Sequence, residues 1–401
     1  MVNREGAEVV VAGHICLDII PKFHKANHEV TLDPGKLISV GESILSTGGV
    51  VPNTGLTLGR LGLPTVLMGK IGGDLFGKAT QNLLGQQPHS FIKQAMIVSP
   101  VESSSYSIVI NPPSEDRVFL HHSGANDTFS SDDVDESVFD GAKLFHFGYP
   151  PLMKNMYLHD GREMVKLLKR VAGLGLITSL DMAKPDPDSP AGQVDWRAFL
   201  NNVLPHVDLF FPSYEEILFM LERHQFEEMY QKSVQTGQQM KIDEGLLKQM
   251  AAELIEMGPT VVAIKLGSEG LYLRTTHNEA CLKRLNLILS SQVSALWKGR
   301  ELYSTCFEAD VVGTTGAGDC TVAGFLFGLL QGWGPEQVLT SAVAVGACSV
   351  EAADATSGIP SWKTIEARLS SGWKRHPVSF NSVHWTESES GVWKGLSDGL
   401  N

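Results

Sequence analysis

The chain has 401 residues, enough for one large domain or two of ordinary size. Its 43% hydrophobic residues can form a substantial core, and 45 acidic against 32 basic residues give a formal net charge of −13. This negative charge disfavours a general nucleic-acid or anionic-membrane binder, which needs a basic face. The five cysteines form no CxxC pair, and no apolar run approaches the roughly 18 residues of a membrane span. The first residues are typical of a strand and not of a signal peptide, so we expect a cytoplasmic protein without disulfides.

Short apolar runs alternate with amphipathic segments along the chain. The runs predict strands at Val9–Ala12, Thr65–Met68, Leu144–Phe147, Leu176–Leu180, Leu209–Phe211, Val261–Leu266 and Phe307–Val312. Helical periodicity covers Gly161–Gly173 and Asp243–Met257, and Gly258-Pro259 ends the second helix. This alternation predicts an α/β fold whose central, mostly parallel sheet is covered by helices on both faces.

Some stretches depart from this rhythm. Residues 22–46 and 96–123 are rich in alternating and β-branched residues, which predict short antiparallel strands of a small lid that projects from the main domain. Residues 275–304 show no clear period and are interpreted as an insertion. We expect one domain over residues 1–370 and a tail over 371–401, whose sequence does not indicate how it packs.

A glycine-rich turn at residues 313–319 joins a predicted strand to an apolar helix. The small residues Gly316, Ala317 and Gly318 let the backbone approach a ligand, and the free N–H groups of a helix start stabilise negative charge. Such a pocket suits a transferred phosphoryl group. Asp319 beside it can accept the proton of an attacking hydroxyl, but an aspartate in a first helical turn can also act as a helix cap. The spacing alone leaves both roles open.

The segment Gly313–Asp319 with its helix resembles the second signature of the ribokinase-like (PfkB) carbohydrate kinases. Other motifs of that family are matched in the same order over roughly residues 8–370, at Gly13–Asp18, Gly48–Asn53, Gly72–Gly77, Gly124–Asp127 and Lys265–Gly270. The resemblance implies a three-layer α/β/α fold with a β lid, and phosphorylation of a hydroxyl with ATP and Mg²⁺. It makes Asp319 the general base and Gly316–Gly318 the anion hole.

The same resemblance implies that Asp18, Gly49 and Asn53 bind the substrate. The chemistry fits, because a carboxylate accepts hydrogen bonds from neighbouring hydroxyls and an amide both donates and accepts them. Taken without the other motifs, Asp18 reads as a turn residue at a strand end, and Asn53 as the N-cap of a helix over 54–61.

The nucleotide end, again by resemblance, comprises Lys265, Gly267, Gly270 and Thr315, although a plain hairpin also explains the glycines after Lys265. Glu216 matches the family's acidic position that acts on magnesium through water. Three positions depart from the pattern: Ser213 replaces an asparagine, Gly313 an aspartate and Ala183 a second asparagine. The change at Ser213 concerns the binding of magnesium and phosphate, and the change at Gly313 concerns activation by potassium. Together the three changes can indicate a subfamily with a different substrate.

Two other site patterns are rejected. Gly72–Lys78 has the spacing of a P-loop, but Ala79 stands where Ser or Thr must hold magnesium. His121 and His122 are adjacent on a predicted strand, so they point to opposite faces and do not share one metal ion.

The leading hypothesis is therefore a kinase acting on a sugar, sugar acid or nucleoside, with no nucleic-acid or membrane partner and with a possible homodimer formed through the lid. A non-catalytic sensor that keeps the fold and binds a metabolite or nucleotide is the alternative, supported by Ser213 and Gly313 and opposed by Asp319. A hydrolase that uses Asp319 on water would form product without ATP.

Overall fold

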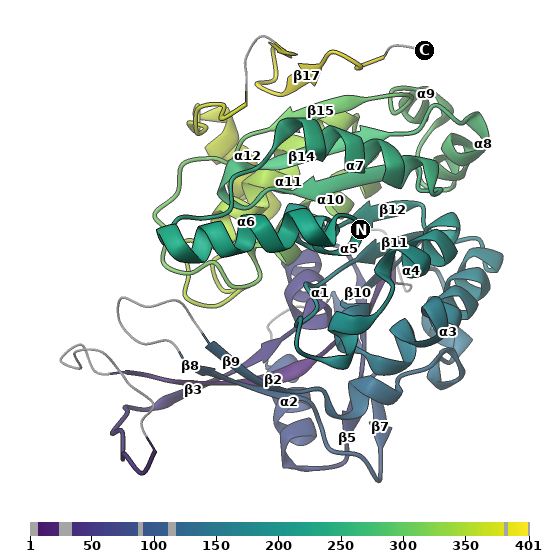
Figure 1. Ribbon diagram of the computed structural model, residues 1–401. Coiled ribbons are helices and arrows are strands. Elements are labelled where there is room, and N and C mark those ends of the chain that lie inside the picture. The colour runs from purple at the N-terminus through teal and green to yellow at the C-terminus, as the bar shows by residue number, and fades with distance from the viewer. Residues whose placement is uncertain (1–6, 24–33, 87–90, 111–117, 381–383, 400–401) are drawn as a thin grey trace.

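The computed structural model describes residues 7–23, 34–86, 91–110, 118–380 and 384–399. Within these residues the centre is an eleven-stranded sheet in the order β16–β17–β15–β14–β13–β12–β11–β10–β1–β4–β6 (Figure 1). Its parallel strands are β1 (Val9–Gly13), β4 (Thr65–Met68), β6 (Ile92–Gln94), β10 (Leu144–Gly148), β11 (Ile177–Asp181), β12 (Leu209–Phe211) and β13 (Val261–Lys265). The antiparallel strands are β14 (Leu271–Thr275), β15 (Glu301–Ser304), β16 (Trp385–Glu387) and β17 (Trp393–Gly395).

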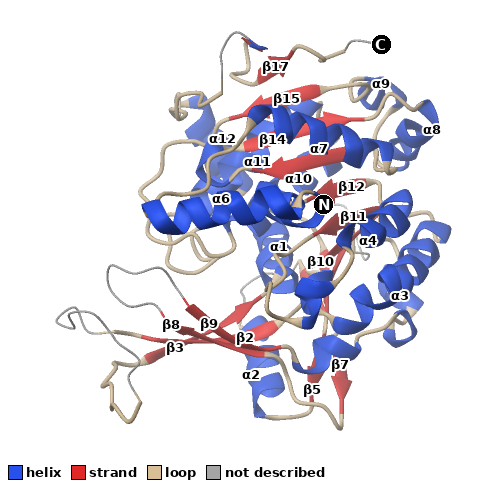
Figure 2. Ribbon diagram, in the orientation of Figure 1, coloured by secondary structure: helices blue, strands red, loops and turns tan. Residues whose placement is uncertain are grey.

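Helices cover both faces of this sheet (Figure 2), because alternate residues of each strand enter different cores. Val10 and Ala12 of β1 belong to the core that includes α3 (Lys154–Gly173), α4 (Trp196–Val203), α5 (Tyr214–Leu221), α6 (Arg223–Thr236) and α7 (Glu244–Glu256). Val9 and Val11 belong to the core that includes α1 (Val50–Arg60), α8 (Glu279–Leu282), α9 (Ser291–Ala295), α10 (Ala317–Leu330), α11 (Pro335–Ser349) and α12 (Trp362–Ser370). The predicted three-layer α/β/α fold is confirmed.

The lid is a separate four-stranded sheet in the order β3–β2–β8–β9, which projects from the main body beside α2 (Leu75–Gly85) (Figure 1). Its strands are β2 (Cys16–Pro21), β3 (Ser43–Gly48), β8 (Tyr106–Ile110) and β9 (Val118–His122). The predicted lid ranges 22–46 and 96–123 contain β8, β9 and most of β3 but miss β2, and β2 pairs with β8 in parallel. Residues 24–33 and 111–117 of those ranges lie outside the described residues.

Not every residue of the second predicted lid range belongs to the lid. Ile97–Ser99 forms β7, which pairs with β5 (Lys70–Gly72) in a small sheet of its own. The adjacent histidines separate as expected, because His121 lies 3.0 Å from the hydroxyl of Ser107 and His122 lies 2.9 Å from that of Ser103.

The strand prediction at Phe307–Val312 is wrong. Phe307 forms only an isolated bridge with Arg375, and Val311 and Val312 are exposed by 66% and 65%. The real strand, β15, lies in the stretch 275–304 that the sequence presented as an insertion. Its first residue, Glu301, is buried, and Arg274 lies 3.5 Å away as its charge partner. The remaining predicted strands lie at β1, β4, β10, β11, β12 and β13, and the two predicted helices lie in the second part of α3 and in α7.

The C-terminal tail extends the central sheet beyond β15 (Figure 1). Trp385 of β16 is 5% exposed, and its ring packs against Tyr272, Tyr303 and Phe380. Its indole N–H donates to Glu244 over 3.0 Å. The tail is therefore an integral edge of the sheet.

The cysteines are free, as expected from their spacing. A search of the described residues for membrane-spanning helices finds none of sufficient length and apolar character.

Replacement of Trp385 by alanine tests the tail's contribution to stability. A buried tryptophan lost to alanine leaves a large cavity, so we expect Trp385→Ala to lower the free energy of unfolding by about 3 kcal/mol. Leu396→Ala, in the same tail but at a side chain 65% exposed, is the control and should change it by less than about 0.5 kcal/mol. Urea unfolding measures both, and equal effects would contradict an integral role for the tail.

Candidate active site

The first turn of α10 lies where several elements meet at the carboxyl ends of the parallel strands. Gly316 is the N-cap of this helix with φ 70°, and a Cβ on it would lie 2.4 Å from the Cβ of Ala355. Glycine is thus required by both the backbone conformation and the space. Asp319 is the third residue of the helix, and no side-chain hydrogen bond caps the helix start. Asp319 is thus an acidic residue in the first turn, where the helix dipole also stabilises a carboxylate, so the helix geometry alone leaves both roles open.

The carboxylate of Asp319 is held by two side chains from other parts of the fold. The amide of Asn53 in α1 donates to Oδ2 over 2.9 Å, and the hydroxyl of Tyr149 donates to Oδ1 and Oδ2 over 2.8 and 2.9 Å. Asp319 is 2% exposed. Burial raises the pKa of its carboxyl, against the hydrogen bonds from Asn53 and Tyr149 and the nearby Lys265 ammonium, which lower it.

Asn53 is not the helix N-cap that its sequence context allowed. The helix begins earlier, at Val50, with Gly49 as its N-cap. Gly49 has φ 93°, and a Cβ there would lie 2.5 Å from the carbonyl oxygen of His14, so this position also needs glycine. Asn53 consequently faces Asp319 from within α1, at the position where the sequence placed a substrate ligand.

Tyr149 is a site residue that the sequence reasoning missed. It follows β10 directly and has a left-handed backbone with φ 66°, which is uncommon outside glycine. Its N–H donates to the carbonyl oxygen of Asp181 over 3.2 Å, and this contact fixes the turn. The available signal was its place between a buried strand that ends in glycine and the pair Pro150-Pro151.

A buried ion pair lies next to the start of α10. Nζ of Lys265, at the end of β13, is 2.5 Å from Oδ1 of Asp181, at the end of β11. Burial lowers the pKa of Lys265, but the carboxylates of Asp181, Glu216 and Asp319 more than offset it and raise the pKa to about 12. A Cβ on Gly318 would lie 3.7 Å from this Nζ, so the ammonium stands beside the proposed anion hole.

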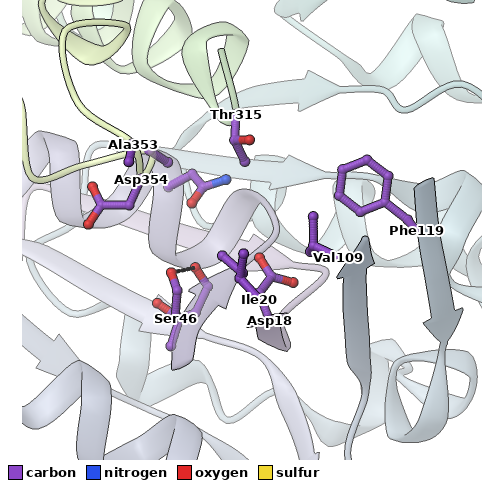
Figure 3. A pocket seen from close by; sticks show the side chains of 11 residues that line it. Asp18, Ile20, Ser46, Val109, Phe119, Thr315, Ala353 and Asp354 are labelled. Carbon is purple, nitrogen blue, oxygen red and sulfur yellow. Dashed lines mark hydrogen bonds between the residues drawn. The ribbon is translucent and has the colours of Figure 1, made fainter. Parts of the chain in front are cut away.

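A pocket opens between the lid and the main body, next to Asn53 (Figure 3). Asp18 of β2 lines it together with Asn53 and Thr315. Asp18 lies within its strand and not at a strand-end turn. Burial raises the pKa of Asp18 to about 6, although hydrogen bonds from Cys16 and Ser107 lower it. The structure thus brings two of the predicted substrate ligands together, and it places Thr315 in the same pocket.

The predicted nucleotide turn connects β13 to β14. Gly267 has φ 60° and open space around its Cα, whereas Gly270 has φ 120° and packs against the backbone of Ser304. The hydroxyl of Tyr303 donates to the carbonyl oxygen of Glu269 over 2.6 Å and holds the turn in place.

Ser213 and Glu216 form a capping box at the start of α5. The carboxylate of Glu216 accepts from the N–H of Ser213 over 2.7 Å, and the hydroxyl of Ser213 accepts from the N–H of Glu216 over 3.3 Å. The hydroxyl of the serine that replaces the family's asparagine therefore caps α5, and the backbone N–H of Ser213 orients the carboxylate of Glu216.

The acidic groups here fit a hydrated magnesium ion. Oδ2 of Asp181 is buried and has no hydrogen-bond partner among the described residues, and Glu216 lies close enough to influence the pKa of Asp181 and Lys265. Groups of three metal-ligating side chains do not occur in the part of the chain that the structure describes. Mg²⁺ does not need one, since it keeps several waters and binds through one or two carboxylates and substrate phosphates.

A glycine-rich helix start beside a buried carboxylate, an ammonium and a polar pocket defines the class of small-molecule phosphotransferases. The family model of the pfkB family carbohydrate kinases matches residues 7–362. The chain belongs to this family.

Curated relatives and solved structures agree with this assignment. An uncharacterized sugar kinase of Archaeoglobus fulgidus is 25% identical over 303 residues, which cover 76% of this chain and 98% of the relative. The 2-dehydro-3-deoxygluconokinase of Bacillus subtilis is 23% identical and covers 84% and 90%. The fold is similar to Arabidopsis thaliana ribokinase complexed with ribose and ATP, with a TM-score of 0.63, 21% identity and coverage of 91% and 99%. It is also similar to fructokinase with bound ATP from Xylella fastidiosa, with a TM-score of 0.66, 15% identity and coverage of 90% and 98%.

As a member of this family the chain is a phosphotransferase with an alcohol group as acceptor and a small sugar-type molecule as substrate. ATP with Mg²⁺ is its phosphate donor. The expectation of an enzyme is confirmed, and nothing in the comparisons favours a non-catalytic sensor.

Proposed function

We propose that this kinase phosphorylates a hydroxyl of a small carbohydrate with Asp319 as the general base and the backbone N–H groups of Gly316, Ala317 and Gly318 as the anion hole. The single observation that carries the proposal is the position of Asp319. It is buried in the first turn of α10, and the hydrogen bond from Asn53 connects it to the pocket that Asp18 lines.

The carboxylate of Asp319 keeps capacity for the acceptor hydroxyl. Its two oxygens offer about four lone-pair sites, and the contacts with Asn53 and with the single, shared hydroxyl proton of Tyr149 occupy at most three of them. The acceptor hydroxyl donates its proton to Asp319 while its oxygen bonds to the γ-phosphorus of ATP, and the bond from that phosphorus to the ADP oxygen breaks. The raised pKa of Asp319 makes the carboxylate a stronger base for this step.

Lys265 supports the transfer from the nucleotide side. Its ammonium, held by Asp181 and close to Gly318, adds positive charge to the N–H groups of the helix start. The turn at Gly267–Gly270 lines the nucleotide in this proposal. Glu216 and Asp181 would hold hydrated Mg²⁺, which when bound neutralises phosphate charge.

Thr315 lies one residue before Gly316 and was expected to bind the nucleotide. It lines the same pocket as Asp18 and Asn53, so we infer that it lies between the acceptor and the phosphate. Lid closure over this pocket would exclude water and limit hydrolysis of ATP.

The outer face of the lid supports a homodimer. Ile19 pairs with Leu45 and Ile108, and Ile108 pairs with Leu120, so these four side chains share one face, opposite to that of Asp18. Leu45 and Leu120 are 49% and 51% exposed. An exposed apolar face of this kind is typical of a protein interface.

A substrate screen with Asp319→Asn tests the kinase proposal. Purified protein with ATP and Mg²⁺ is incubated with pooled sugars, sugar acids and nucleosides, and mass spectrometry detects phosphorylated products. We expect Asp319→Asn to lower turnover by about 10²- to 10⁴-fold, the contribution of a general base. Asp310→Asn, an exposed carboxylate on the same loop, is the matched control and should retain activity. Turnover by Asp319→Asn close to that of the unmodified protein, or product formed without ATP, would overturn the proposal.

Tyr149→Phe tests how Asp319 is tuned. The base must be ionised, so kcat/KM falls as the pH drops through the pKa of Asp319. Loss of the Tyr149 hydrogen bond removes a contact that lowers this pKa, so the acid limb of the pH profile should move to higher pH, with activity recovering above it. Tyr157→Phe, which lies in α3, is the control. An unchanged or lower acid limb would show that Tyr149 does not tune Asp319.

The homodimer is tested by light scattering after size exclusion. We expect the mass of a dimer, about twice the 43.5 kDa of one chain, and a monomer for the double variant Leu45→Ser and Leu120→Ser. A monomeric unmodified protein at micromolar concentration would contradict this interface. Cytoplasmic location and the lack of a nucleic-acid partner stay predictions, which cell fractionation and filter binding can check.

A further inference from the structure

The inner face of the lid carries two rows of side chains of different character. In the polar row, Asp18 pairs with Ser46 on one side and Ser107 on the other, and Ser107 pairs with His121. Paired residues in neighbouring strands point to the same face. Because Asp18 and Ser46 line the pocket (Figure 3), the whole row faces this pocket, which Asn53 also lines.

The apolar row lies farther out along the same strands. Ile20, Val109 and Phe119 are each two residues from a member of the polar row, and all three line the pocket. Two residues along a strand span roughly 7 Å. Val109 is 5% exposed, whereas Phe119 is 52% exposed and offers an uncovered aromatic face.

The opposite wall of the pocket comes from the main body. Figure 3 places Ala353 and Asp354 across the pocket from Val109 and Phe119, with Thr315 above them. The backbone N–H groups of Thr356 and Ser357 donate to Oδ1 of Asp354 and fix its carboxylate. The described lining thus contains two carboxylates, from Asp18 and Asp354, and no Lys or Arg side chain. Burial lowers the pKa of His121 in the polar row, so its imidazole is neutral near pH 7 and supplies no positive charge.

We propose that the acceptor is an uncharged hydroxylated ring that carries an apolar substituent, as in a nucleoside or an aryl glycoside, and that sugar acids are rejected. The proposal rests on the proposed kinase function and specifies its substrate class. Hydroxyls of the ring bind Asp18, Asn53 and the polar row. A substituent that reaches about 7 Å beyond them meets Ile20, Val109 and Phe119.

The negative charge of the pocket explains why we expect it to reject sugar acids. A carboxylate in this pocket would lie near the carboxylates of Asp18 and Asp354, and the described lining offers it no Lys or Arg side chain, so like-charge repulsion disfavours its binding. A free monosaccharide meets no such repulsion, but it also leaves the apolar row uncovered. We therefore expect the pocket to favour a neutral ring with an apolar substituent over a free monosaccharide, and a free monosaccharide over a sugar acid.

The test compares each parent sugar with a substituted form or, for gluconate, with the open-chain acid formed by oxidation. Ribose is compared with inosine and uridine, glucose with phenyl β-glucoside, and glucose with gluconate. For each compound kcat/KM is measured with ATP and Mg²⁺, and binding is measured by calorimetry without ATP. We expect the nucleoside or the phenyl glycoside to exceed its parent sugar by about tenfold or more, and gluconate to fall below glucose by at least about tenfold. The comparison with ribose measures the effect of a nucleobase, and the comparison of glucose with phenyl β-glucoside measures the effect of an aryl group.

Variants assign the effect to the two features. Phe119→Ser should reduce the preference for the substituted compound over its parent. Leu37→Ser, at a side chain that is 96% exposed and outside the lid strands, should leave that ratio unchanged. Asp354→Asn should raise gluconate relative to glucose by about tenfold. A preference that survives Phe119→Ser, or that falls equally in Leu37→Ser, overturns the role of the apolar row.

The outcomes separate this inference from the kinase proposal. Turnover that favours gluconate, or that is equal for parent and substituted sugars, overturns the substrate class while the kinase stands. Selective binding of the substituted compounds without any phosphorylation supports the substrate class and overturns the proposed chemistry. Neither binding nor turnover of any compound overturns both.

Discussion

The burial of Asp319 at the start of α10 is the constraint on which the rest of the site depends. A carboxylate with 2% exposure needs compensating partners, and these come from four separate elements: the helix start itself, Asn53 in α1, Tyr149 after β10 and the ammonium of Lys265 at the end of β13. Lys265 in turn needs Asp181 at the end of β11. Parallel strands bring these groups to one edge of the sheet, so the fold and the chemistry share one set of contacts.

Substrate selection is separated from this charged centre. Asn53 is the link, since its side chain lines the lid pocket and also donates to Asp319. The lid contributes Asp18 and the apolar side chains that face the pocket, and it does so from strands outside the central sheet. Changes in the lid can therefore alter which acceptor enters without disturbing the buried charges, which is how one fold can serve several substrates.

Much of this arrangement could be predicted from local patterns. The buried strands β4 and β12 coincide with their apolar runs, and the glycine positions at 49 and 316 reflect positive φ angles that exclude other residues. Contacts between distant segments could not be predicted in this way. Tyr149 contacts Asp319 although the two residues are 170 positions apart in the chain. The strand β15 could not be predicted because its buried, charged residue Glu301 is compensated by Arg274 on the neighbouring strand β14. The burial of Trp385 in the tail likewise depends on packing against Tyr272 and Tyr303, which lie far away in the chain.

A crystal structure with a non-hydrolysable ATP analogue, Mg²⁺ and the acceptor identified by turnover tests the central claim most directly. The account predicts that the reacting hydroxyl lies about 2.6–3.2 Å from a carboxylate oxygen of Asp319, with the γ-phosphate against the N–H groups of Gly316–Gly318. An acceptor hydroxyl held elsewhere, with Asp319 still enclosed by Asn53 and Tyr149 alone, would contradict it.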